Sequence, residues 1–90
     1  MPETRLDRIR SLLQREFAPE LLHVEDESHL HAGHAGARDG RGHFRVTIVS
    51  AAFEGHNRLQ RHRMVFDALG DLMQTDIHAL SVQAHSPAEI

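Results

Sequence analysis

Apolar residues near the start of the chain recur every three or four positions, which predicts an amphipathic helix. They are Leu6, Ile9, Leu13 and Phe17. Thr4 and Asp7 have the spacing of a capping box at its start, although glutamate is more usual than aspartate at the second position. Pro19 cannot continue a helix. We therefore expect the first helix to begin just after Thr4 and to end before Pro19.

Strict alternation of apolar and polar residues predicts a half-buried strand over residues 43–50. Phe44, Val46 and Ile48 are its inward positions. Residues 20–31 and 76–83 also read as strands. Residues 32–42 contain four glycines and no apolar period, which predicts a mobile loop joining the first two strands as a hairpin.

A second helical pattern follows Asn57, which has capping-box spacing with Gln60. Its predicted core face consists of Leu59, Val65, Phe66, Leu69, Leu72 and Met73. His62 falls on the same stripe, so we expect a partly buried imidazole that bonds to backbone. Gly70 weakens the helix without having to end it. Residues 51–55 form a connector of about one helical turn before this helix.

These elements predict a single α/β (α+β) domain over residues 1–90. The strand–helix–strand unit over 44–82 favours a right-handed crossover, which makes the last strand parallel to the second. A three-stranded mixed sheet with helices packed on one face follows. We expect an ordered core over about residues 4–84 and a tail over 85–90.

The composition combines nine histidines with no cysteine. A disulfide-stapled extracellular domain is thereby excluded, and any iron–sulfur site would need sulfur from another molecule. The formal net charge of −3 argues against a strongly basic nucleic-acid binder. No apolar segment approaches the roughly 20 residues that cross a bilayer. We therefore expect a cytoplasmic protein without a membrane partner.

Three histidines within six positions form the first candidate metal site: His29, His31 and His34. On a strand the first two point the same way, and the third can fold back from the loop. Three imidazoles suit zinc or copper; a solvated polar loop explains the same pattern. His78 lies in an apolar strand, where a lone histidine is usually structural.

The second helix begins with the cluster Arg58, Arg61, His62 and Arg63. Guanidinium groups bind phosphates and carboxylates, so this cluster predicts a partner or nucleic-acid surface. The sequence has no nucleophile elbow, P-loop or dinucleotide fingerprint. It therefore makes no case for an enzyme.

The stretch from residue 43 to residue 79 strongly resembles the BolA family. The shared motifs are a His-Phe-x-Val strand ending in Val-Ser over 43–50, Phe-x-Gly at 53–55, Arg-His-Arg at 61–63 and His-Ala-Leu at 78–80. His56 departs from the family, which often has lysine or another polar residue there. The loop over 32–42 also differs in sequence and length. With its helical start, the resemblance covers nearly the whole chain.

The resemblance implies a class II KH-like fold with the order α-β-β-α-α-β. It also implies a non-enzymatic partner of a monothiol glutaredoxin in iron–sulfur cluster assembly or trafficking, or in iron and redox signalling. In such complexes a shared [2Fe–2S] cluster takes sulfur ligands from the glutaredoxin cysteine and glutathione. The family's final-strand histidine matches His78, and its loop ligand matches His31, with His34 as the alternative. We expect no cluster in the isolated chain, which would be a monomer or a weak homodimer.

Two other functions stay open at this point. Some family members are described as DNA-binding transcription regulators of stress response and cell morphology, which would use the KH-like helix-turn-helix face and its arginines. The negative net charge and the lack of base-stacking aromatics count against tight DNA binding. A stand-alone metal-binding module built on His29, His31 and His34 is the second alternative.

Overall fold

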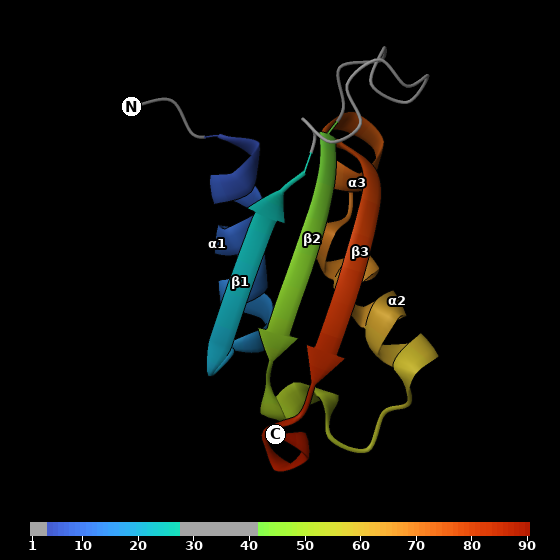
Figure 1. Ribbon diagram of the computed structural model, residues 1–90. Helices are drawn as coiled ribbons and strands as arrows, with labels where there is room; N and C mark the ends of the chain where they lie inside the picture. The colour runs from blue at the N-terminus through green and yellow to red at the C-terminus, as the bar shows by residue number, and fades with distance from the viewer. Residues whose placement is uncertain (1–3, 28–41) are drawn as a thin grey trace.

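The computed structural model describes residues 4–27 and 42–90, which form one three-stranded sheet and its covering helices (Figure 1). The elements in chain order are α1 (Arg5–Phe17), β1 (Leu21–Asp26), β2 (Gly42–Val49), η3 (Ala51–Phe53), α2 (Arg58–Leu69), α3 (Leu72–Thr75), β3 (Ile77–His85) and η4 (Pro87–Glu89). β2 pairs with β1 antiparallel and with β3 parallel. The predicted mixed sheet and element order are confirmed.

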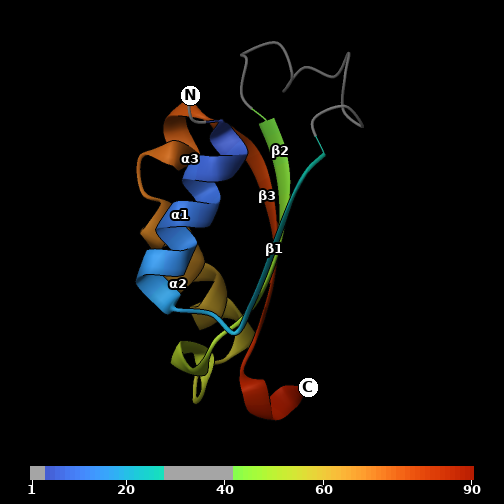
Figure 2. The ribbon, with the colours of Figure 1, turned by 90° about the vertical axis from the view of Figure 1, so that its left-hand side faces the viewer.

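The core lies between the sheet and α1, α2 and α3, which cover the same face of the sheet (Figure 2). Phe44, Val46 and Ile48 of β2 are buried, as their alternation predicts. They belong to one cluster with residues from the other elements: Ile9, Leu13, Val24, Phe53, Val65, Leu69, Ile77 and Val82. Burial of this apolar cluster is the main force that holds the helices on the sheet.

Both predicted capping boxes are present. The Thr4 hydroxyl accepts a hydrogen bond from the Asp7 amide at 3.1 Å, and the Asp7 carboxylate accepts one from the Thr4 amide at 3.4 Å. Asn57 and Gln60 exchange the same two bonds at 2.8 and 2.9 Å. Each box satisfies amides that the first helical turn leaves without intrahelical partners.

The second helix is shorter than its apolar pattern predicts. Gly70 has φ +50° and ψ −121°, a conformation that suits glycine and breaks the helical path. α2 therefore ends at Leu69, and α3 begins as a separate turn at Leu72. The prediction that Leu59 belongs to the core is also wrong: it is 59% exposed on the first turn of α2.

The strand ends differ from the predicted ones. β1 stops at Asp26, while residues 28–31 of the predicted strand and residues 32–41 of the predicted loop lie outside the described residues. Gly42, placed in the loop by its composition, is the first residue of β2. Within the segment predicted as a tail, 85–90, His85 completes β3 and Pro87–Glu89 form η4. No helix in the described ranges is long and apolar enough to span a membrane.

Candidate functional site

Two imidazoles meet where β2 and β3 begin. His43 is the second residue of β2 and His78 the second residue of β3. Their ring centroids are 5.2 Å apart, with 54° between the ring planes. The sequence assigns no metal-binding role to His43, which lies 35 positions before His78.

A register shift explains why the His78 side chain is exposed. Gly42 pairs with Ile77 but His43 pairs with Ala79, so His78 is an extra residue in β3. Simple alternation would turn His78 to the core together with Val82, which is buried. The shift instead leaves Ile77 in the core and His78 exposed beside His43. Re-aiming a side chain in this way is a common use of a bulge.

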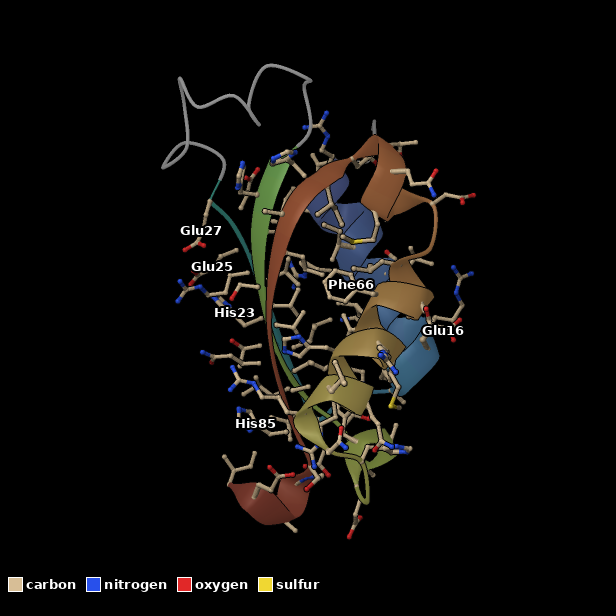
Figure 3. All side chains as sticks on the ribbon, turned by 90° about the vertical axis from the view of Figure 1, so that its right-hand side faces the viewer. Glu16, His23, Glu25, Glu27, Phe66 and His85 are labelled. Carbon is tan, nitrogen blue, oxygen red and sulfur yellow. The ribbon has the colours of Figure 1, made fainter. Side chains whose placement is uncertain are left out.

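The uncovered face of the sheet, on the side away from the helices, carries polar side chains. Figure 3 shows His23 and Glu25 projecting from β1 on that side, whereas Phe66 lies on the helix side. The His23 ring and the Glu25 carboxylate are 2.8 Å apart. Polar residues on one face of a small sheet keep that face compatible with water and accessible to other molecules.

The segment that carries His29, His31 and His34 lies outside the described residues, but both of its flanking residues lie at the His78 end of the sheet. The Glu27 amide donates to the His43 carbonyl at 2.7 Å, and the Gly42 amide donates to the Asp76 carbonyl at 2.9 Å. Glu27 and Gly42, the described residues on either side of this segment, therefore lie at the same end of the sheet as the two imidazoles.

The donor set of this site is incomplete within the described ranges. No three histidine, cysteine or acidic side chains gather there in a way that could hold a metal ion. Imidazole nitrogen is a good ligand for iron, copper and zinc, and the chain has no cysteine. Within the described ranges, the two imidazoles therefore do not form a metal site by themselves.

The predicted arginine surface divides between structural and exposed residues. Arg61 is largely buried, with a 13% exposed side chain, and connects three elements. It donates to the Phe53 and Ala84 carbonyls at 3.1 Å each and pairs with the Glu89 carboxylate. Arg58 and Arg63 are exposed, so the two of them remain available as a contact surface.

His62 contacts backbone, as its place on the apolar stripe predicts. Its Nε2 lies 3.1 Å from the carbonyl oxygen of Val82 in β3. β3 is an edge strand, and unpaired edge carbonyls invite unwanted pairing with other chains. His62 bonds the carbonyl of Val82, and Arg61 bonds the carbonyl of Ala84, two residues further along β3. These two side chains therefore satisfy part of the strand's edge.

A groove of about 590 Å³ opens between the first turns of α2 and the last residues of β3. Its lining includes Arg58, Arg61, His62, His85 and Glu89. The hydrogen bond from Arg61, reinforced by the hydroxyl and amide of Ser86, lowers the pKa of Glu89 to about 2. Glu89 in turn raises the pKa of Arg61. This ion pair fixes η4 at one end of the groove.

The C-terminal turn was not predicted, although the sequence contains a signal for it. Ser86 and Glu89 form a capping box, and Pro87 stands at the first helical position, where its missing amide costs no hydrogen bond. The register shift at His78 has no comparable signal in the sequence.

Comparisons with known proteins agree with this fold. A family model described as BolA-like protein matches residues 13–89. Protein BOLA1, chloroplastic, of Arabidopsis thaliana is 46% identical over 90 residues, covering 97% of this chain and 56% of the relative. The solved BolA domain of SufE1 from the same plant has a TM-score of 0.87 and 42% identity, covering 100% of both chains.

A relative from Haemophilus influenzae, named DNA-binding transcriptional regulator BolA, is 37% identical over 81 residues, covering 90% of this chain and 76% of the relative. The chain spans 24% to 57% of the length of the first curated relatives that it matches. Some of these relatives are named for chloroplasts or mitochondria, so a cytoplasmic location stays a prediction.

Proposed function

The chain belongs to the BolA-like protein family, and from that premise we propose that it is a non-enzymatic partner of a monothiol glutaredoxin that co-ligates a [2Fe–2S] cluster. The observation that carries the proposal is the exposure of the His78 imidazole, which faces away from the core because of the register shift between β2 and β3. An exposed imidazole on an uncovered sheet face can reach an iron held mainly by another protein.

His78 and a histidine from residues 28–41 would be the two ligands from this chain. His31 is four positions after Glu27, and four residues of chain span at most about 14 Å. His31 matches the family's loop ligand and is our first choice for the second ligand, and His34 is the alternative. Glutaredoxin cysteine and glutathione would supply the thiolates, which this cysteine-free chain lacks.

The cluster would supply redox chemistry and a transferable iron–sulfur unit. Imidazole ligation on one iron raises the reduction potential relative to ligation by cysteine alone. Neutral imidazoles bind metal and protonated ones do not, so the chain's own contribution would weaken as pH falls below the usual histidine range. Either cluster transfer or iron and redox sensing is compatible with such a centre.

Anaerobic co-purification with a monothiol glutaredoxin and glutathione tests the proposal. We expect a stable mixed complex with two irons and two sulfides per cluster. His78→Ala and His31→Ala should each change its visible spectrum, whereas His23→Ala, an exposed histidine elsewhere on the sheet, should not. An unchanged spectrum in both ligand variants would overturn the ligand assignment, and absence of the complex would overturn the function.

DNA binding is the second candidate, favoured by the name of the Haemophilus influenzae relative and by the exposed Arg58 and Arg63. Titration of labelled duplexes at physiological salt and near-neutral pH would test it. Tight, sequence-dependent binding that falls in Arg58→Gln and Arg63→Gln would support DNA regulation. Weak binding abolished by moderate salt is the non-specific electrostatic signature and would count against it.

A stand-alone metal-binding module using His29, His31 and His34 stays a further prediction. Metal analysis of the untagged chain, purified without a metal-affinity column, tests it directly. Zinc or copper bound in stoichiometric amount by the isolated chain, and lost when these three residues become alanine, would favour that module over a centre shared with a partner.

A further inference from the structure

The groove between α2 and β3 lies at the opposite end of β3 from His78. It is lined by the residues 82–85 of β3, whereas His78 is near the strand's first residue (Figure 1). His85 is seven positions after His78 along the strand, which corresponds to roughly 23 Å. A molecule in the groove would therefore leave the His43–His78 end uncovered.

Cationic groups and imidazoles dominate the lining of this groove. They are His56, Arg58, Arg61, His62 and His85, and Glu89 is the one acidic residue among those that line it. A volume of about 590 Å³ lies within the usual range for ligand sites, about 300–1,000 Å³. Two guanidinium groups against one carboxylate make the groove complementary to a carboxylate-bearing occupant.

Glu89 already lies in the groove in the way that a carboxylate ligand would. One of its oxygens accepts from the Arg61 guanidinium and from the Ser86 hydroxyl at 2.7 Å. The other oxygen is 3.9 Å from Nδ1 of His85. Yet the Glu89 side chain is 40% exposed and belongs to a three-residue turn at the end of the chain. Moving it aside would disturb few contacts of the core.

We propose that this groove is a docking site for an extended, acidic peptide segment of a partner protein, and that Glu89 is the intramolecular occupant that such a segment displaces. Carboxylates of the segment would pair with Arg58 on the rim and with Arg61 once Glu89 has left. The edge strand β3 forms one wall of the groove. Its Val82 and Ala84 carbonyls are already bonded to His62 and Arg61, so the segment would be recognised by its side-chain charges rather than by main-chain pairing.

The lining favours a peptide over a nucleic acid. No phenylalanine, tyrosine or tryptophan is among the residues that line the groove, so bases would find no aromatic platform. Its permanent cations are two arginines, one of which is paired with Glu89. Nucleic-acid binding depends on neutralising several phosphates at once. A short run of carboxylates matches two guanidinium groups better.

Titration of the isotope-labelled full chain with acetyl-hexaglutamate amide, followed by amide chemical shifts, tests this proposal without glutaredoxin or iron. We expect saturable shifts confined to residues 56–62 and 82–90 at millimolar peptide, and none with acetyl-hexaglutamine amide. Absence of saturable shifts in these two segments would overturn the proposal. Tighter binding of a DNA duplex than of hexaglutamate in the groove, at the same salt concentration, would also overturn the proposal and would indicate a nucleic-acid site.

Matched variants separate the groove from general charge attraction. Arg58→Gln should weaken hexaglutamate binding about threefold, the size of a part-exposed ion pair, whereas Arg63→Gln on the same helix lies outside the lining and should have no effect. Glu89→Gln should strengthen binding by a similar factor because it leaves Arg61 available. Equal effects of Arg58→Gln and Arg63→Gln, or weaker binding in a folded Glu89→Gln variant, would overturn the proposal.

Discussion

The rings of His43 and His78 lie 5.2 Å apart because β3 accommodates one residue more than β2 at this point. The extra residue is His78 itself, and its exposure on the sheet depends on the register shift. The same backbone feature therefore exposes a candidate ligand and gives it an imidazole neighbour. A second imidazole at this distance can orient the first without ligating a metal.

Replacing His43 tests whether it supports His78 or ligates iron itself. If His43 only supports His78, His43→Ala should leave the spectrum of the glutaredoxin complex close to that of the parent. It should make cluster loss about 10-fold faster or more, since supporting groups typically alter metal affinity by about 10- to 100-fold. Stopped-flow chelation of iron from the complex would measure the rate. A spectral change as large as that in His78→Ala would make His43 the second ligand in place of His31.

The bond between His62 and the edge of β3 should contribute to stability. His62→Ala leaves the Val82 carbonyl without its 3.1 Å partner, and we expect a loss of about 1–2 kcal/mol in the free energy of unfolding. Urea denaturation at pH 7 would measure it. Arg63→Ala, an exposed neighbour on the same helix, is the matched control and should change stability by less than ~0.5 kcal/mol. Equal losses in both variants would contradict this role for His62.

Much of the fold was predictable because local patterns and global packing agree. The alternation in β2 names the buried residues Phe44, Val46 and Ile48 correctly, and the Thr4 and Asn57 capping boxes mark where two helices begin. Leu59 was misassigned because periodicity cannot tell that the first turn of α2 extends past the core. The end of α2 at Gly70 was not predicted, because residue type alone does not show that this glycine has a positive φ.

The candidate site was less predictable than the fold. His78 was assigned by resemblance to a family, since a lone histidine in an apolar strand reads as structural. Its exposure depends on a one-residue shift between paired strands, which is a tertiary property that alternation within a single strand cannot reveal. Arg61 was predicted to lie on a contact surface because arginine side chains often bind partners. In the structure its guanidinium is instead bonded within the fold to two carbonyls and a carboxylate.

Ser50 should be a stabilising residue at the junction of the helices and the sheet. It is 1% exposed, donates to the Phe17 carbonyl at 2.7 Å and accepts from the Ala52 amide at 3.1 Å. Ser50→Ala leaves both groups without this partner, so we expect a loss of about 2 kcal/mol in urea denaturation. Ser81→Ala, at an exposed position of β3, should cost less than ~0.5 kcal/mol. A loss that small in Ser50→Ala would contradict the role of its two bonds.

The Arg61–Glu89 pair should make the C-terminal turn sensitive to acid. Hydrogen bonds from Arg61 and Ser86 lower the pKa of Glu89 from its ordinary value of 4.5 to about 2. Because the pKa is lower in the folded chain, the charged carboxylate stabilises the fold above about pH 4.5, and this contribution is lost as pH falls toward 2. Denaturation at pH 6 and near pH 2 should therefore show Glu89→Gln to be less stable than the parent at the higher pH and nearly equal to it at the lower. A difference between the two chains that does not change with pH would show that η4 is held by contacts other than this ion pair.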